Sequence, residues 1–87
     1  MSENTSGEFF DFAMPKFEET SESAILLKWL KQPGDAVAEG EAIAEVETEK
    51  FTHPLESPVT GELAEHLCAE GDDVEVGVLI ARFRVEG

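Results

Sequence analysis

Residues 34–40, GDAVAEG, recur 37 residues later as residues 71–77, GDDVEVG. The same offset pairs apolar residues outside these two segments: Leu26 with Leu63, Leu30 with Leu67, Ile43 with Ile80, and Ala44 with Ala81. Two half-length copies therefore fill most of the chain from about residue 13 onward. Because two copies are too few for a solenoid, the repeat predicts a closed pair of halves related by a pseudo-twofold axis.

Three segments have the residue pattern of β-strands. Residues 42–48, AIAEVET, alternate apolar and polar side chains, as a half-buried strand does. Residues 51–56 and 78–85 are plausible further strands. Pro54 cannot donate a ladder hydrogen bond, so we expect it in an edge strand or at a non-bonded position.

Two further segments, residues 23–32 and 62–70, are rich in Ala, Leu, Glu and Lys, and each ends close to a glycine. Propensity alone predicts helices there. We predict strands instead, because the neighbouring repeat segments are strands and because of the family resemblance described below. Tertiary context often overrides local propensity.

The repeat also predicts the position of Lys50. This residue lies at the junction of the two copies, and the 37-residue offset relates it to residues 13 and 87. A twofold axis carries this junction onto the pair of chain ends. We therefore expect Lys50 at the end of the molecule opposite residues 13 and 87.

Composition restricts the possible partners. The chain has 87 residues, with 6 basic and 20 acidic side chains and a formal net charge of −14. Nucleic acids and anionic membranes bind positive surfaces, so we expect neither as a partner. A basic protein surface fits better, although the charge can also serve solubility alone. A single cysteine and the absence of a signal or transit peptide pattern lead us to expect a bacterial cytoplasmic protein.

The sequence around Lys50 resembles the lipoyl domain family, found in the acyltransferase components of 2-oxo acid dehydrogenase complexes. The family has a glycine 16 residues before its lysine and another 11 residues after it, where this chain has Gly34 and Gly61. The matching segments are residues 14–16 (MPK), residues 47–52 (ETEKFT), residues 56–61 (ESPVTG) and the two Gly-Asp segments.

The resemblance implies an all-β fold, a flattened barrel of two four-stranded sheets with pseudo-twofold symmetry. It covers residues 12–87, and residues 1–11 are expected to form a loose acidic leader. Gly34 and Gly61 are expected to be structural turn residues. We expect the isolated domain to be monomeric, either as a free-standing protein or as the N-terminal part of a dihydrolipoamide acyltransferase.

The resemblance further implies a lipoate group joined to Lys50 through an amide, attached by a lipoate ligase or lipoyl transferase. The domain would be a non-catalytic carrier, and the lipoyl arm would move acyl groups from a thiamine-dependent 2-oxo acid decarboxylase to an acyltransferase core. Dihydrolipoamide dehydrogenase would then reoxidise the arm. Thr48 and Glu49 would help the modifying enzyme recognise the hairpin, and Phe51 would flank the site.

Two other functions stay open at this point. Biotin carrier domains share the architecture but have methionine on both sides of their lysine, a pattern that Glu49 and Phe51 do not match. The other alternative is an unmodified interaction module that binds partners through its acidic face. The sequence favours no particular 2-oxo acid over acetoin-type substrates.

Other chemistry is disfavoured by the residues themselves. Glu47 and Glu49 favour the charged form of Lys50, which is the opposite of what a catalytic base needs. His53 and His66 have no cysteine or third histidine at ligand spacing, so we expect no metal site. The family usually has a small residue after its lysine, and Phe51 and His53 depart from its pattern.

Overall fold

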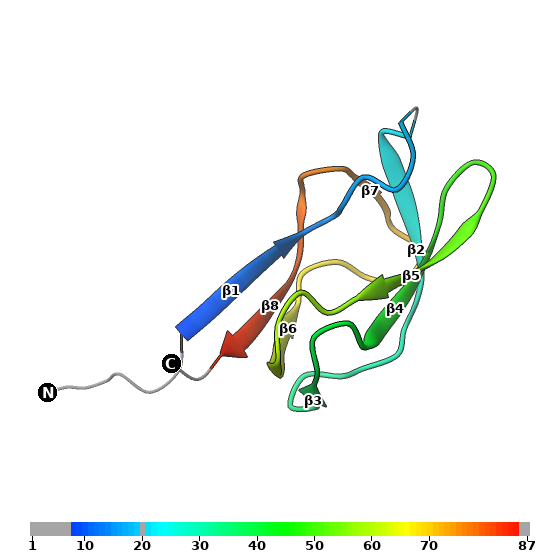
Figure 1. Ribbon diagram of the computed structural model, residues 1–87. Helices are drawn as coiled ribbons and strands as arrows, with labels where there is room; N and C mark the ends of the chain where they lie inside the picture. Colours follow the sequence, from blue (N-terminus) through cyan, green and yellow to red (C-terminus); the bar gives the residue numbers. More distant parts are fainter. Residues whose placement is uncertain (1–7, 20, 86–87) are drawn as a thin grey trace, which may run out of the picture.

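The part of the chain that the structure describes contains eight β-strands and no helix. The structure is a computed structural model, and it describes residues 8–19 and 21–85 (Figure 1). The strands are β1 (Glu8–Ala13), β2 (Ser23–Trp29), β3 (Ala36–Val37), β4 (Ala42–Glu47), β5 (Thr52–Glu56), β6 (Gly61–His66), β7 (Asp73–Glu75) and β8 (Leu79–Val85). The all-β prediction is confirmed. Within the described residues no helix could span a membrane.

The strands form two antiparallel sheets of four strands each, as expected. One sheet has the order β1-β8-β6-β3 and the other β5-β4-β2-β7. Each half of the chain contributes two strands to each sheet, so neither half can form its sheets alone. β5 is an edge strand, the first of the two positions expected for Pro54.

The 37-residue repeat is visible in the hydrogen bonds. The Gly34 N–H donates to the Leu63 carbonyl at 2.8 Å, and the Gly71 N–H donates to the Leu26 carbonyl at 2.7 Å. The 37-residue offset relates each bond to the other, because it pairs Gly34 with Gly71 and Leu26 with Leu63. Both glycines have a positive φ, 100° at Gly34 and 94° at Gly71, which glycine adopts without strain. Gly34 therefore lies in a turn, as predicted.

A stacked pair of rings joins the two halves. The Trp29 and His66 rings, which the offset relates to each other, stack with centroids 3.8 Å apart and planes 6° apart. Trp29 Nε1 donates to the Cys68 carbonyl at 3.1 Å, and His66 Nε2 lies 2.9 Å from the Lys31 carbonyl. A carbonyl oxygen only accepts, so His66 Nε2 carries a proton.

The core lies between the two sheets and has the same symmetry. Its largest fully buried side chains include the repeat partners Leu26 and Leu63, and Ile43 and Ile80. The complete set is Met14, Leu26, Ile43, Val46, Leu55, Leu63, Ile80 and Phe83. Burial of this apolar surface is the main contribution that stabilises the fold.

β-bulges interrupt the apolar–polar alternation of β2 and β6, which explains why neither segment has the two-residue pattern of a regular strand. The pairing register shifts between Leu26 and Lys28 in β2, and between Leu63 and Glu65 in β6. A bulge adds one residue and interrupts the two-residue alternation. Leu26 and Trp29 are therefore both buried although they are three residues apart, the spacing of a helix face.

The expected leader of residues 1–11 is too long. Residues 8–11 belong to β1, which pairs with β8 from Glu8 opposite Val85 onward, and residues 1–7 lie outside the described residues. Arg82 Nε donates to Asp11 Oδ1 at 2.9 Å, and the Phe12 and Phe83 rings are in contact with centroids 6.0 Å apart. These contacts are favourable only in the folded chain, so composition alone did not reveal the strand.

The turn between β4 and β5 lies at the opposite end of the molecule from the start of β1 and the end of β8 (Figure 1). Lys50 is in this turn. The residues at that opposite end are Glu8 and Val85. We expected residue 13 there, but β1 begins earlier than the repeat indicated. Residue 87, the other expected marker, lies outside the described residues.

Candidate functional site

Lys50 lies at the tip of a tight β-hairpin. β4 and β5 pair as far as Glu47 opposite Thr52, and the Thr48 N–H donates to the Phe51 carbonyl at 2.8 Å. The turn therefore leaves Glu49 and Lys50 beyond the last backbone pair, and both are exposed. No described residue forms an ion pair or hydrogen bond with the Lys50 side chain. A partner enzyme can therefore approach the amine from outside the domain.

Phe51 follows Lys50 and is also exposed. Its side chain is 57% accessible, and its ring meets the His53 ring edge-on with centroids 6.1 Å apart. An aromatic ring this exposed gains little from the core, so its contribution to folding is small. Phe51 thus flanks the lysine in space, and its role in recognition stays a prediction, as does that of Glu49.

Thr48 is turned inward. It is only 6% exposed, and its hydroxyl donates to Glu18 Oε2 at 2.7 Å. The same hydroxyl oxygen lies 3.4 Å from the Phe51 N–H, which donates to it. Thr48 therefore connects the turn to the loop between β1 and β2. The buried hydroxyl is not accessible for direct contact with a modifying enzyme, and the role of Thr48 in recognition stays a prediction.

Glu18 is the residue that sequence reasoning missed. Its Oε2 also lies 3.2 Å from His53 Nε2, and the His53 ring stacks on the Phe17 ring with centroids 4.6 Å apart. The hydrogen bonds from Thr48 and then His53 hold the pKa of Glu18 below its ordinary value. The only feature of the sequence that pointed to this contact was His53, which departs from the family pattern. No local pattern connects it to a residue 35 positions earlier.

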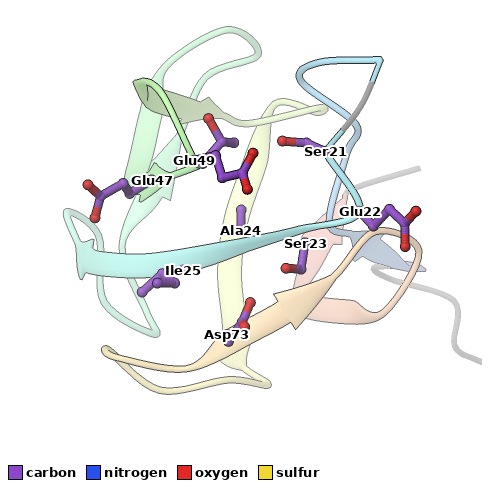
Figure 2. A pocket seen from close by; sticks show the side chains of 9 residues that line it. Ser21, Glu22, Ser23, Ala24, Ile25, Glu47, Glu49 and Asp73 are labelled. Carbon is purple, nitrogen blue, oxygen red and sulfur yellow. The ribbon is translucent and has the colours of Figure 1, made fainter.

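On one side of the hairpin the surface is hollowed. A cavity of about 540 Å³ lies between the start of β2, β7 and the hairpin (Figure 2). Its acidic lining residues are Glu22, Glu47, Glu49 and Asp73. Carboxylates at this density favour cationic groups on whatever approaches the lysine.

Gly61 does not lie in a turn, contrary to expectation. It is the first residue of β6, and its backbone packs closely against β8. A Cβ atom at this position would lie 2.2 Å from the Arg84 carbonyl oxygen. Glycine is therefore required by the close approach of two strands instead of by a turn conformation.

The described residues contain no group of three or more His, Cys, Asp or Glu side chains that could hold a metal ion. Each histidine is committed to a stacking contact, His53 with Phe17 and His66 with Trp29. The arrangement around Lys50 contains an exposed amine, a rigid hairpin and acidic surroundings. Chemically it offers an attachment point for a group brought from elsewhere.

Comparisons with known proteins agree with this interpretation. The family model Biotin_lipoyl, described as "Biotin-requiring enzyme", matches residues 11–83. The structure is similar to the solution structure of the lipoyl domain of the 2-oxoglutarate dehydrogenase complex from Azotobacter vinelandii, with a TM-score of 0.72 and 32% identity. That match covers 88% of this chain and 98% of the other.

Two curated relatives are much longer than this chain. The dihydrolipoyllysine-residue succinyltransferase component of the 2-oxoglutarate dehydrogenase complex from Staphylococcus saprophyticus is 46% identical over 68 residues, 78% of this chain and 16% of the relative. The dihydrolipoyllysine-residue acetyltransferase component of the pyruvate dehydrogenase complex from Corynebacterium glutamicum is 40% identical over 73 residues, 84% of this chain and 11% of the relative.

Proposed function

Because this chain belongs to the biotin and lipoyl attachment family, in which it matches a lipoyl domain over nearly that domain's full length, we propose that it carries lipoate on Lys50. The observation that supports this best is the position of Lys50, exposed at the tip of the β4–β5 hairpin. The start of β1 and the end of β8 lie at the opposite end. An arm attached there points away from both.

The residues around Lys50 fit a covalently attached lipoate. Amide formation needs an amine that a second enzyme can reach, and no described residue pairs with the Lys50 side chain. Recognition of one lysine by that enzyme is also favoured by an ordered backbone around the amine. The bond from the Thr48 N–H to the Phe51 carbonyl provides this. A lipoate ligase or lipoyl transferase would join the lipoate carboxyl group to Lys50 Nζ.

When attached, lipoate supplies a disulfide that can accept an acyl group and two electrons. The domain itself positions the arm and presents an acidic surface, and we expect it to catalyse no step. In a 2-oxo acid dehydrogenase complex its partners would be a thiamine-dependent decarboxylase, the acyltransferase core and dihydrolipoamide dehydrogenase. The relatives are components of 2-oxoglutarate and pyruvate complexes, which supports this class of assembly. From the single cysteine and the composition, we propose a bacterial cytoplasmic location for this protein.

Biotin carriage is the second candidate, because the matching family model also includes biotin-attachment domains. The curated relatives described above are all dihydrolipoyllysine proteins, which favours lipoate. The two residues that flank Lys50 also favour lipoate. They are Glu49 and Phe51, whereas biotin domains have methionine at both positions. An unmodified interaction module is the remaining alternative.

Intact mass spectrometry tests this proposal. The protein is co-expressed with a lipoate ligase in medium containing lipoate and biotin, together with Lys50→Arg and Lys28→Arg variants. Lys28 is an exposed lysine in β2 and serves as the matched control. We expect one lipoyl increment on the wild type and on Lys28→Arg, and none on Lys50→Arg. A biotin increment, or no increment on folded wild type, contradicts lipoate carriage.

A further inference from the structure

The two halves of the fold differ at one connection. β1 and β2 are joined by residues 14–22, whereas the equivalent strands β5 and β6 are joined by residues 57–60. The second half makes the same crossing with five fewer residues. The barrel therefore does not need the longer connection in order to close, and the extra residues call for a different explanation.

The longer connection contacts the Lys50 hairpin. Glu18 accepts a hydrogen bond from the Thr48 hydroxyl at 2.7 Å, and the same carboxylate oxygen lies 3.2 Å from His53 Nε2. Phe17 stacks on the His53 ring at 4.6 Å, with the planes 9° apart. One short segment of the connection thus binds both sides of the hairpin, the turn residue Thr48 and the β5 residue His53.

These contacts are well placed to restrict the turn. Thr48 is almost fully buried, so its hydroxyl has little access to water and needs an acceptor within the protein. The Glu18 carboxylate at 2.7 Å is closer than the Phe51 carbonyl at 3.1 Å. A hydrogen bond to an ionised acceptor is about twice as strong as one between neutral groups. Within the described residues, the other bonds that close the turn join Thr48 and Phe51 to each other. Glu18 is the contact that ties the turn to another part of the domain.

We propose that Glu18 is a positioning residue for lipoate attachment: through Thr48 and His53 it holds the turn in the conformation that the modifying enzyme binds. This inference rests on the proposed function, in that Lys50 is the attachment site. Glu18 does not touch the reacting amine, and it acts by restricting the backbone of residues 48–51. A modifying enzyme that binds an ordered turn loses less conformational entropy than one that must order it.

The test compares Glu18→Ala with Glu18→Gln and with Glu19→Ala. Glu19 is the exposed neighbour of Glu18 and is the matched control. Two quantities are measured on each folded variant: kcat/KM for lipoylation by a lipoate ligase, and the backbone NMR order parameters of residues 48–51. We expect Glu18→Ala to lower kcat/KM about tenfold, the cost of about one hydrogen bond to a charged group. The order parameters of Glu49 and Lys50 should fall below about 0.6.

The conservative variant separates positioning from charge. Glu18→Gln keeps an oxygen that accepts from Thr48, so it should retain at least about a third of the wild-type kcat/KM, consistent with a neutral hydrogen bond in place of a charged one. Glu19→Ala should behave as wild type. In a Thr48→Val background the Glu18→Ala change should have less than half of its effect on kcat/KM, because the shorter of the two contacts that it removes is already absent.

The comparison of kcat/KM and order parameters can contradict the inference in two ways. If Glu18→Ala and Glu19→Ala have equal kcat/KM and equal order parameters, Glu18 does not position the turn. If Glu18→Ala only lowers the urea midpoint while both quantities stay at wild-type values, its role is structural. The failure of the proposed function looks different: the wild type then receives no lipoate. In that case the order parameters alone decide whether Glu18 holds the turn.

Discussion

At the scale of single residues, the Glu18 carboxylate connects two parts of the chain that are distant in sequence. Thr48 and His53 both bind it, and both stabilise its ionised form. Their hydrogen bonds hold the pKa of Glu18 below its ordinary value of 4.5. A lowered pKa in the folded state makes this contact dependent on pH.

The first prediction concerns acid. The Glu18 contribution to the free energy of unfolding should be fully present above pH 4.5 and should disappear as the pH falls through the lower pKa of the folded state. Urea unfolding of wild type and Glu18→Gln between pH 7 and pH 2 measures it. The two midpoints should converge in acid, since protonated Glu18 no longer carries the charge that Gln lacks. A gap that widens below pH 4.5 contradicts this assignment.

The second prediction concerns Cys68. Its burial, and to a smaller extent the negative charge of Asp72, raise the pKa of its thiol above the ordinary 9.0. Less thiolate is then present at pH 8, so iodoacetamide should alkylate Cys68 more slowly than a cysteine in a short peptide. In concentrated urea the two rates should become equal. A fast reaction in the folded state would show that the thiol is exposed and unperturbed.

At the scale of strands and turns, glycines are required for two different reasons. Gly34 has a φ of 100° in a turn, and nothing lies within 4 Å of the position where a Cβ would be. Gly61 has no such backbone requirement, but a Cβ there would meet the Arg84 carbonyl oxygen of β8 at 2.2 Å. The first site is limited by conformation and the second by space.

The third prediction follows from this difference. Gly34→Ala should cost about 1–2 kcal/mol of unfolding free energy, the strain of a left-handed alanine. Gly61→Ala should cost about 3 kcal/mol or more, because β6 and β8 must separate in the middle of a four-stranded sheet. Gly34→Asn, which tolerates positive φ, should be milder than Gly34→Ala. Equal costs for the two alanine variants, measured by urea unfolding, would count against the close approach of the strands.

At the scale of the whole molecule, the pseudo-twofold symmetry makes the two halves energetically similar. Ile43 and Ile80 are repeat partners, and both are completely buried in the core between the sheets. Ile43 lies in β4, one of the two strands of the Lys50 hairpin, and Ile80 lies in β8. Because each half supplies strands to both sheets, the core is formed only when the halves come together.

The fourth prediction tests this equivalence. Ile43→Val and Ile80→Val should each lower the free energy of unfolding by about 0.5–1.5 kcal/mol, and the two values should agree within about 0.5 kcal/mol. Leu27→Val, at an exposed position of β2, is the control and should cost less than either. Denaturant unfolding followed by Trp29 fluorescence gives all three values. A cost at one position more than twice that at the other would indicate that the two halves pack differently.

The sequence by itself determined the repeat, the all-β fold and the position of Lys50 between two strands. These follow from residues 34–40 and 71–77, from the alternation in residues 42–48 and from the family pattern around the lysine. Such signals are local or recur at a constant spacing, so they can be found in a linear chain. The edge position of β5 was one of two that Pro54 allowed, because proline lacks an N–H whatever surrounds it.

Only the tertiary structure decided which distant residues meet. The bond between Glu18 and Thr48 depends on the path of a connection that is five residues longer than its counterpart in the second half. Position 61 requires a glycine only because the Arg84 backbone lies so close to it. Residues 8–11 form a strand only because they pair with the edge of β8. Each of these results from packing between segments that are separated by more than 20 residues. No periodicity or propensity within one segment contains that information.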